Sequence, residues 1–414
     1  MSVRDEVTEW LAANWDPDVT TRTWWDRLAE SGWGAPMWPK EWHGRGLGRA
    51  EANEVGSAFR AAGAIGAPAG LGMLLAAPTI LVHGTDVQKA RYLRSILDGT
   101  EAWCQLFSEP GAGSDLASLS CKAERDGDEW VITGQKVWTS HGHLSDLGML
   151  IVRTDPNAPK HRGISYFAID MHQPGIEVRP LKEMTGRAMF NEVFLDEARV
   201  PDSARIGDLG AGWAVTNTTL AAERSGLGAG AAGAEGGAFP GKISGNLDRL
   251  AGSMRNKKGS VAAMGTLATG SYAYLKNIAE QNGALNRPAV RHALVRLWTI
   301  DKLGRVSSLR ARANARRGQG LTGGEANLAK LAQSEIARTV TNLGPSILGA
   351  GGMLSGADAP DEGVIAEMAL FAAATSIYGG SDQIQRNIIG ERVLGLPKEP
   401  GPDKDTPFRE LRIN

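Results

Sequence analysis

The first hundred residues carry the spacing of amphipathic helices. Near the N-terminus, apolar side chains recur every three or four residues, at Val3, Val7, Trp10, Leu11 and Trp15. Asp86 is a residue type that caps helices, and a second such series follows it at Val87, Tyr92, Leu93, Ile96 and Leu97. The pattern predicts an N-terminal helical domain over residues 1–103.

After about residue 104 the helical period gives way to short β-rich runs separated by turn residues. Six runs have this character: Trp130–Ile132, Val137–Thr139, Leu147–Val152, Ile164–Ile169, Ile176–Pro180 and Glu192–Leu195. Because each run is short and bounded by turn residues, it is typical of a strand in a compact sheet. We therefore expect a middle β domain over residues 104–210.

From Gly212 onward the pattern is helical again. Long helical segments are expected around residues 213–230, 287–317, 324–348 and 361–376. They predict a C-terminal helical domain over residues 211–397. Residues 234–260, rich in Gly, Ser, Lys and Arg, are interpreted as an insertion in that domain. Residues 398–414 contain proline and alternating charge, and we expect this tail to dock on the surface or on a neighbouring subunit.

Composition narrows the class of protein. Of the 414 residues, 42% are hydrophobic and 22% are charged, as in globular proteins with more than one core. The net charge of −1 gives no reason to expect nucleic acid as a partner. No run reaches the roughly 18 apolar residues of a membrane span, and the segment MSVRDEVTEWLAANW lacks the layout of a signal peptide. With only Cys104 and Cys121, a disulfide framework is excluded, and we expect a cytoplasmic location.

The densest cluster of conformationally special residues is Cys104–Leu119, CQLFSEPGAGSDLASL. Proline fixes φ, whereas glycine allows positive φ and removes side-chain bulk. Backbone N–H groups of such a loop can lie against a flat or anionic ligand, with two hydroxyls and two carboxylates beside them. Shorter clusters of this kind are usually ordinary turns. The number of special residues in this run favours a ligand-binding loop.

Three other motifs lack the context that their usual function needs. Gly228–Gly233 matches G-x-G-x-x-G, but a helix-like sequence precedes it where a dinucleotide site requires a strand. Gly236–Lys242 matches most of a phosphate loop, but Ile243 stands where a Ser or Thr would hold magnesium. His141 and His143 have no companion ligands in the sequence around them, so we expect no metal site.

Three blocks together resemble the signatures of one family. The loop at residues 104–119 is followed by Trp130–Ser140, WVITGQKVWTS, and by Tyr378–Asn387, YGGSDQIQRN. In sequence and order these blocks resemble the acyl-CoA dehydrogenase flavoproteins. The resemblance implies an α+β fold with an N-terminal helical domain, a middle β-barrel or sandwich, and a C-terminal four-helix bundle. It also implies FAD as cofactor, an acyl-CoA substrate, and an electron-transfer flavoprotein that receives the electrons.

The resemblance assigns the first block to one wall of the FAD site. Phe107 and Ser108 would lie at the pyrimidine side of the flavin. Gly113 and Ser114 would lie near the pyrophosphate, and Ser114 would also contact the substrate.

The other two blocks supply the remaining cofactor contacts that the resemblance implies. Trp138 would pack against the isoalloxazine ring, and the Ser140 hydroxyl would reach N5. Taken alone, Trp138 would be interpreted as an ordinary core aromatic residue. Ser381 and Gln383 match positions that contact the adenosine half of FAD.

The catalytic base departs from one branch of the family. Medium- and short-chain members carry a glutamate directly after the tyrosine of the third block, where this chain has Gly379. Isovaleryl- and long-chain-type members instead place the glutamate before an arginine at the start of the C-terminal domain, as in Glu223-Arg224. The resemblance thus implies Glu223 as the base and Arg224 as a substrate contact. An apolar setting makes a carboxylate a stronger base, whereas an ion pair on a helix surface is the alternative interpretation of Glu223.

Two elements that complete a neighbour's FAD site in homotetrameric members are degraded here. An Arg-x-x-Phe-Gly segment is replaced by Ala279–Gly283, and a Gln-x-x-Gly-Gly element is replaced by Ser346–Ala350. A lost arginine–pyrophosphate contact is worth about 1.5–3 kcal/mol. Two assemblies stay open: a homotetramer with a different contact, and an α2β2 heterotetramer with a related subunit.

The function implied is the α,β-dehydrogenation of an acyl-CoA thioester, in which a base takes the α-proton and flavin N5 takes the β-hydride. The missing carboxylate at Gly379 points weakly to a branched, ring-bearing or otherwise bulky acyl group. Two other functions stay open. One is an acyl-CoA oxidase that uses oxygen, and the other is a heterotetramer subunit with little or no activity alone.

Overall fold

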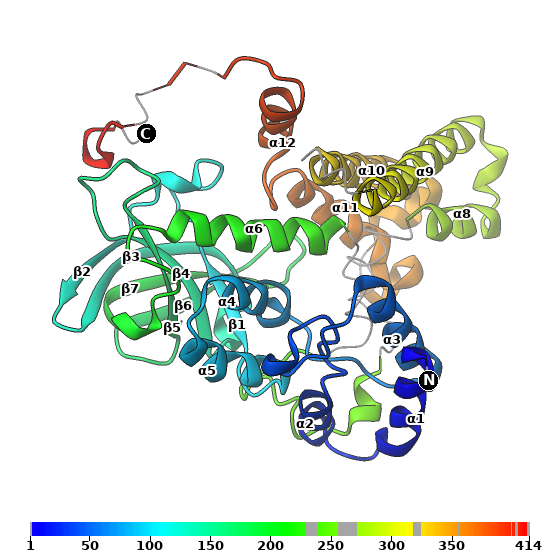
Figure 1. The fold of residues 1–414 in the computed structure, drawn as a ribbon. Helices are drawn as coiled ribbons and strands as arrows, with labels where there is room; N and C mark the ends of the chain where they lie inside the picture. Colours follow the sequence, from blue (N-terminus) through cyan, green and yellow to red (C-terminus); the bar gives the residue numbers. More distant parts are fainter. Residues whose placement is uncertain are drawn as a thin grey trace.

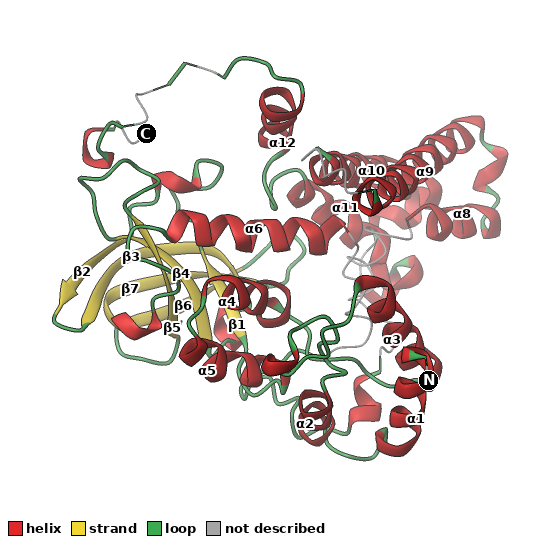
Figure 2. Ribbon diagram, in the orientation of Figure 1, coloured by secondary structure: helices red, strands yellow, loops and turns green. Residues whose placement is uncertain are grey.

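The computed structural model describes residues 2–228, 238–255, 271–317, 324–354, 356–398, 400–401 and 405–411. A group of helices, a β-sheet and a second group of helices follow one another along the chain (Figures 1 and 2). The predicted alternation of helical, β and helical regions is therefore confirmed. None of the helices within these ranges is long and apolar enough to cross a membrane.

Five α-helices precede the sheet, and three of them begin at a hydroxyl side chain that caps the helix. The five are α1 (Val3–Asn14), α2 (Thr21–Ser31), α3 (Arg49–Ala62), α4 (Ala77–His83) and α5 (Asp86–Leu97). Ser2 Oγ accepts a hydrogen bond from the backbone N–H of Asp5 at 3.2 Å, which caps α1. Thr85 Oγ1 accepts one from the N–H of Gln88 at 3.3 Å and so caps α5. The cap of α5 is therefore Thr85, one residue before the expected Asp86, because the Thr85 hydroxyl makes this contact.

Seven strands form the middle sheet. They are β1 (Trp103–Leu106), β2 (Lys122–Asp126), β3 (Glu129–Ser140), β4 (Leu147–Arg153), β5 (Ile164–Asp170), β6 (Ile176–Leu181) and β7 (Phe190–Pro201). Their order is β1-β4-β2-β3-β7-β6, with β5 paired to β4. Strand β1 runs parallel to β4, and β3 runs antiparallel to β2 and β7. The two runs expected at 130–132 and 137–139 belong to the single strand β3, whose register shifts after Lys136.

Strands β4 and β5 are buried on both faces, which explains their continuous apolar sequences. Met149 and Ile151 pack with side chains of α4 and α5. Leu150 and Val152 point the other way, into a core formed by the strands themselves. The sheet therefore has its N-terminal helices on one face and its own interior on the other.

Helix α6 (Gly212–Gly228) runs from the sheet toward the C-terminal helices (Figure 1). Thr216 and Thr219 are fully buried on one of its faces. The hydroxyl of Thr219 lies 2.8 Å from the Thr79 hydroxyl of α4 and 3.4 Å from the Tyr166 hydroxyl of β5. Burial raises the pKa of Tyr166, which keeps the phenol neutral in this cluster. These contacts fix α6 against both the N-terminal helices and the sheet.

Most of the described C-terminal helices share one hydrophobic core. The helices are α8 (Ser271–Gln281), α9 (Pro288–Arg316), α10 (Glu325–Leu348), α11 (Val364–Thr375) and α12 (Asp382–Ile388). Leu275, Leu297, Val340 and Met368 place α8, α9, α10 and α11 in that core. The packing of these four helices agrees with the expected helical bundle, and α12 joins α10 at its edge.

The described part of the expected insertion packs against the N-terminal helices. Leu247 and Ala251 are buried in the core that contains Trp24. The backbone N–H of Thr21 donates to the carbonyl of Arg249 at 2.8 Å. Residues 238–255 are therefore held by the helical region at the other end of the chain. Residues 234–237 and 256–260 of the expected insertion lie outside the described residues.

The described part of the C-terminal tail docks on the middle domain. Phe408 is buried, and the Arg153 guanidinium lies 3.7 Å from its ring centroid. The backbone N–H of Phe408 donates to the carbonyl of Ala158 at 3.0 Å. The expected docking of the tail thus occurs on the same chain.

Candidate active site

The first block is held by a buried ion pair that the sequence motifs did not reveal. Lys136 of β3 is fully buried, and its Nζ lies 2.8 Å from Glu109 Oε1. Lys136 also donates to the Phe107 carbonyl at 3.1 Å. The backbone N–H groups of Ser120 and Cys121 donate to the same Glu109 carboxylate at 2.7 and 3.0 Å. One buried charge pair therefore joins the first block to the second.

The electrostatics of Glu109 follow from this arrangement. Burial on its own would raise the pKa of the Glu109 carboxyl, but the Lys136 ammonium and the donated hydrogen bonds hold it below the usual value. The backbone N–H of Val137 donates to the Ser108 carbonyl at 2.8 Å, directly beside the pair. Phe107 is buried and meets the Tyr166 ring edge-to-face, with centroids 5.9 Å apart. The wall that carries Phe107 and Ser108 is therefore rigid.

The tip of the first block is open. Glu109 and Ala112 exchange backbone hydrogen bonds of 3.0 and 3.1 Å, so the chain turns sharply between them. A Cβ atom added at Gly111 or at Gly113 would meet nothing within 4 Å. Ser114 is exposed. The loop thus presents its backbone and one hydroxyl to free space, as a cradle for an anionic ligand requires.

Trp138 occupies an unusual position for a strand tryptophan. Its φ is +61°, in the left-handed region, and it lies in the irregular stretch of β3 between Lys136 and Thr139. The indole is 62% exposed and meets the Phe190 ring edge-to-face, with centroids 6.1 Å apart. Such strain at a large exposed aromatic residue favours a binding role over a core role.

The residues after Trp138 continue this wall. Ser140, the last residue of β3, is half-buried. Thr139 Oγ1 is buried and has no hydrogen-bond partner among the described residues. His141 is also left-handed, at φ +54°, and burial lowers the pKa of its imidazole. His143 bonds to the Asn191 amide oxygen at 3.0 Å rather than to a metal-binding cluster. The described residues contain no group of three or more potential metal ligands.

Glu223 lies where α6 passes over the first strand. It follows the buried Thr216 and Thr219 at helical intervals, so it falls on the same face one turn later. The side-chain amide of Gln105 in β1 donates to Glu223 Oε2 at 3.4 Å. The carboxylate is half-buried and acts electrostatically on the ammonium of Lys330 in α10. The side chain of Arg224 lies outside the described residues.

The third block forms the end of the turn between α11 and α12 and most of α12. Gly379 and Gly380 have φ values of +64° and +85°. The buried Gln385 donates from its side-chain amide to the carbonyls of both glycines, at 3.0 and 3.1 Å. A residue with a Cβ costs about 1–2 kcal/mol in the left-handed region. The local conformation thus disfavours a glutamate at Gly379.

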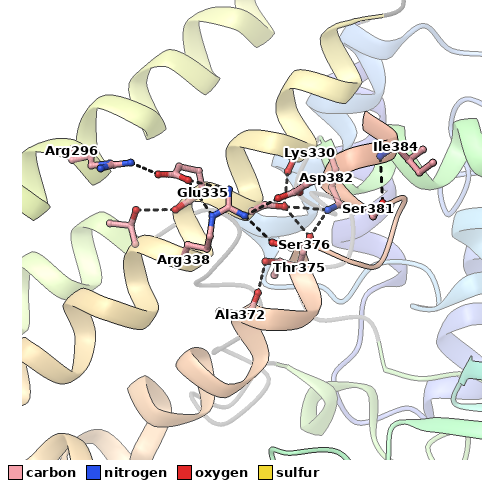
Figure 3. Close-up of polar contacts among 12 residues, drawn as sticks. Arg296, Lys330, Glu335, Arg338, Ala372, Thr375, Ser376, Ser381, Asp382 and Ile384 are labelled. Carbon is pink, nitrogen blue, oxygen red and sulfur yellow. Dashed lines mark hydrogen bonds and ion pairs between the residues drawn. The ribbon is translucent and has the colours of Figure 1, made fainter. Parts of the chain in front are cut away.

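Ser381 and Gln383, the two cofactor residues expected in this block, lie in different environments. Ser381 caps α12, because its Oγ accepts a hydrogen bond from the N–H of Ile384 at 3.4 Å (Figure 3). Gln383 is exposed on the first turn of α12. Asp382 between them is buried and receives the Arg338 guanidinium at 2.7 Å. Ser381 therefore has a structural role in addition to the proposed cofactor contact.

The two degraded elements contact each other within one chain. Ala279 is fully buried in the C-terminal core. The side-chain amide of Asn282 donates to the Ile347 carbonyl at 2.9 Å, and the Arg287 guanidinium donates to the Ser346 carbonyl at 2.6 Å. These two hydrogen bonds therefore join the end of α8 and the start of α9 to the end of α10.

Sequence profiles of the acyl-CoA dehydrogenase family match the chain in three places. The N-terminal domain matches residues 2–100, the middle domain matches residues 104–198, and the C-terminal domain matches residues 257–394. Together they cover most of the 414 residues. The chain belongs to the acyl-CoA dehydrogenase family.

Named relatives cover almost the whole chain. The acyl-CoA dehydrogenase IpdE1 of Mycobacterium tuberculosis is 37% identical over 91% of this chain and 88% of its own length. The protein of the same name from Mycolicibacterium smegmatis is 34% identical over 96% of this chain and 97% of its own. The solved ChsE4-ChsE5 complex of M. tuberculosis contains a chain with a TM-score of 0.68 and 27% identity, over 96% of this chain and 97% of that one. A steroid ACAD, Tcur3481-Tcur3483, has a TM-score of 0.70 and 28% identity over the same shares.

FAD is the cofactor of this family, and the residues of this chain fit it. The open backbone at Gly111 and Gly113 suits the diphosphate, and the exposed Trp138 suits a flat ring. The sequence motifs do not single out Lys136 or Lys330. For Lys136, the available signal was a lysine inside a strand-like run two residues before Trp138. Lys330 gave no such signal, because lysines are common on helices.

Proposed function

We propose that this acyl-CoA dehydrogenase removes hydrogen from Cα and Cβ of an acyl-CoA thioester, with Glu223 as the base, and passes the electrons to an electron-transfer flavoprotein. The observation that supports this most directly is the contact between Glu223 and Gln105, at 3.4 Å. It brings a carboxylate to the strand that leads into the flavin loop. The alternative carboxylate position is Gly379, whose left-handed backbone disfavours a side chain.

In the proposed reaction each residue group has a separate task. Glu223 takes the α-proton, and the Gln105 amide orients its carboxylate. FAD, when bound, accepts the β-hydrogen as a hydride. Phe107, Ser108, Gly113 and Ser114 hold the cofactor from the first block, with Ser114 also contacting the substrate.

The remaining contacts of the proposal come from the other blocks. Trp138 and Ser140 cover the ring system from β3, and the exposed indole would be shielded from water in the complex. Ser381 and Gln383 contact the adenosine half. Arg224 contacts the substrate next to the base.

The base is tested with Glu223→Gln. Glutamine has the same shape and can still bond to Gln105, so the variant should bind FAD with an unchanged visible spectrum. Turnover should fall about 10²–10⁴-fold, the usual contribution of a positioned base. Glu177→Gln is the matched control, because Glu177 is exposed on β6 and pairs with Arg179 of the same strand at 2.7 Å. Near-normal turnover in Glu223→Gln would contradict the proposed base.

We further propose that the active assembly is an α2β2 heterotetramer with a related subunit. Ala279 stands where homotetrameric members have an arginine, and Ser346 stands where they have a glutamine. The carbonyls of Ser346 and Ile347 already accept hydrogen bonds from Arg287 and Asn282 of the same chain. The names of two structural relatives, ChsE4-ChsE5 and Tcur3481-Tcur3483, describe pairs of unlike chains. Expression alone should give low FAD occupancy, and co-expression with the related subunit should restore it. Full, stable occupancy in the isolated chain would instead favour a homotetramer.

The electron acceptor and the acyl group are tested together. Anaerobic titration with a panel of acyl-CoA thioesters should bleach the flavin absorption only with the true substrate class. We expect bulky, branched or ring-bearing acyl groups to be accepted, because Gly379 leaves space where a carboxylate would stand. Hydrogen peroxide formed without an added acceptor would instead identify an oxidase. A colourless protein, even when purified with its partner, would identify a non-catalytic subunit.

A cytoplasmic location completes the proposal. Cys104 and Cys121 are both buried and unpaired, as expected in a reducing compartment. Fractionation of cells that express a tagged chain would test it, and recovery outside the cytoplasmic fraction would contradict it.

A further inference from the structure

The second half of the first block, residues 115–119, is anchored by a buried cation that has no part in the proposed reaction. This cation is Arg153, the last residue of β4, of which only 3% is exposed. Its Nη2 donates to the carbonyl of Ala117 at 2.6 Å and to that of Leu119 at 3.3 Å. Its Nη1 donates to the carbonyl of Lys160 at 2.6 Å. One guanidinium thus joins the first block to the loop between β4 and β5.

The charge of Arg153 is buried among neutral acceptors. All three of its side-chain hydrogen bonds end on backbone carbonyls, and its Nε is buried without a hydrogen-bond partner among the described residues. Burial is the largest influence and lowers the pKa of Arg153 to about 10, whereas the carboxylates of Glu109 and Asp155 favour the charged form. The guanidinium therefore stays charged near neutral pH and depends on the groups that replace water around it.

The C-terminal tail supplies one of those groups. The centroid of the buried Phe408 ring lies 3.7 Å from the carbon of the guanidinium. An aromatic face stabilises a desolvated cation more than an exposed one. The tail is fixed there by its backbone, because the N–H of Phe408 donates to Ala158 and that of Arg409 donates to Pro156, both at 3.0 Å. Figure 1 shows the described C-terminal segment beside the middle domain.

The loop between β4 and β5 also reaches the first block by a second contact. Lys160 Nζ donates to both carboxylate oxygens of Asp115, each at 2.8 Å. Pro159, directly before Lys160, forms an isolated β-bridge with Pro407 of the tail. This ion pair is partly exposed, so we expect it to contribute less than the buried contacts of Arg153. The tail thus supports both contacts from behind the loop.

The tip of the first block, residues 110–114, lies between two anchors. Before the tip, Glu109 is fixed by the buried ammonium of Lys136 at 2.8 Å. After the tip, residues 115–119 are fixed by Arg153 and by its neighbours in the loop and the tail. The two glycines of the tip carry no side chain that could pack and hold it. The position of the tip therefore depends largely on these two anchors.

We propose that Arg153 and Phe408 are positioning residues for the diphosphate-binding tip, so that the C-terminal tail is part of the FAD site of its own chain. This inference rests on the proposed contact of Gly113 and Ser114 with FAD. Without the ring, water reaches one face of the guanidinium and competes with the carbonyls of the first block for its hydrogen bonds. Residues 115–119 then gain freedom, and FAD has to restrict them again on binding, at a cost in affinity.

Substitutions at Phe408 separate its aromatic face from simple burial. Phe408→Tyr keeps the ring, Phe408→Leu keeps apolar bulk without the aromatic face, and Phe408→Ala removes both. Arg153→Lys keeps the charge but loses the planar fork that reaches three carbonyls. Arg409→Ala is the matched control, because its side chain is exposed and its backbone bond to Pro156 stays.

Two measurements are made on the assembled protein. FAD is removed from each variant, and the affinity for added FAD is determined by flavin fluorescence. Hydrogen exchange at the amides of residues 115–121 in the FAD-free protein reports on the anchor itself, and exchange in β5 serves as the reference.

We expect Phe408→Ala to weaken FAD binding on the order of tenfold, as the loss of a desolvated cation–π contact predicts. Exchange at residues 115–121 should become faster while exchange in β5 stays the same. Phe408→Leu should lie between Phe408→Ala and the unsubstituted protein, and Arg153→Lys should weaken FAD binding at least as much as Phe408→Ala. Phe408→Tyr and Arg409→Ala should keep the original FAD affinity and exchange.

The outcomes that contradict the inference are distinct from those that contradict the FAD site. Unchanged FAD affinity in Phe408→Ala or in Arg153→Lys, with weaker binding in Trp138→Ala, would overturn the role of that residue alone. Unchanged affinity in all three would overturn the proposed FAD site and this inference together. Weaker FAD binding in Phe408→Ala with equally faster exchange in β5 would show that the ring only stabilises the fold, and would overturn its positioning role.

Discussion

The buried pair of Lys136 and Glu109 offers the sharpest test of how the flavin loop is held. Lys136→Met removes the ammonium and leaves a similar apolar stem, so a carboxylate with 6% exposure loses its counter-ion at 2.8 Å. The Phe107 carbonyl loses its donor at 3.1 Å as well. Breaking one side of a buried ion pair costs about 3–5 kcal/mol.

The remaining contacts of Glu109 refine this magnitude. Three donors stay in place: the N–H and the hydroxyl of Ser120, at 2.7 and 3.0 Å, and the N–H of Cys121, at 3.0 Å. They compensate part of the stranded charge, so we expect a loss near the lower end of that range, about 3 kcal/mol. The double variant Lys136→Met/Glu109→Gln should recover a large part of the loss, because no buried charge is left unpaired.

The pH dependence of the same variant has a definite sign. Lys136 holds the pKa of Glu109 below its usual 4.5, so the stability from the pair is present above that value. That stability is lost as the pH falls through the lowered pKa of the folded state. In Lys136→Met the part of this lowering that comes from the ammonium disappears, so unfolding in acid should begin at a higher pH than in the unsubstituted protein.

The assay is urea unfolding followed by circular dichroism, at equal FAD concentration for every variant and at several pH values. Release of FAD, followed by flavin fluorescence, reports on the region of the loop. A loss below about 1 kcal/mol in Lys136→Met would refute the reasoning, because surface ion pairs already reach that magnitude. A double variant no more stable than the single one would refute it too, since the stranded charge would then not be the cause.

Three further predictions use other features. Trp138→Ala should change the free energy of unfolding by less than about 1 kcal/mol, because the indole is 62% exposed, but it should weaken FAD binding in a flavin-fluorescence titration; a strong loss of stability without a change in FAD affinity would contradict this. Gly379→Ala should cost about 1–2 kcal/mol in thermal unfolding, since φ there is +64°, and equal stability would contradict the left-handed turn. Phe408→Ala should release the tail from Arg153 and speed limited proteolysis after residue 398, whereas Arg409→Ala, at an exposed neighbour, should not; equal cleavage of both would refute the docking contact.

Much of the fold was predictable because its signals are local. Helical spacing at Val7 and Leu11, and the apolar runs of β4 and β5, need only neighbouring residues to be interpreted. Local signals predicted one helix cap and one strand incorrectly. The cap of α5 is Thr85 rather than Asp86, and β3 is one strand with an irregular register rather than two.

The candidate site was also predictable only in part. The glycine-rich loop, the Trp138 block and the Tyr378–Asn387 block are short motifs, so the sequence alone indicated the family, and its profiles confirm it. The buried partners of those motifs were not predictable. Lys136 and Glu109 are 27 residues apart, and Gln105 and Glu223 are 118 apart, so no periodic pattern connects them.

The sequence by itself determined the family, the order of helical and β regions, and the residue types available to an FAD site. These depend on side-chain chemistry and on contacts between near neighbours. Only the tertiary structure decided which charges are buried, which hydroxyl caps which helix, and which backbone carbonyl accepts the hydrogen bond from Lys330. Those outcomes depend on desolvation, which is set by everything packed around a group rather than by its position in the chain.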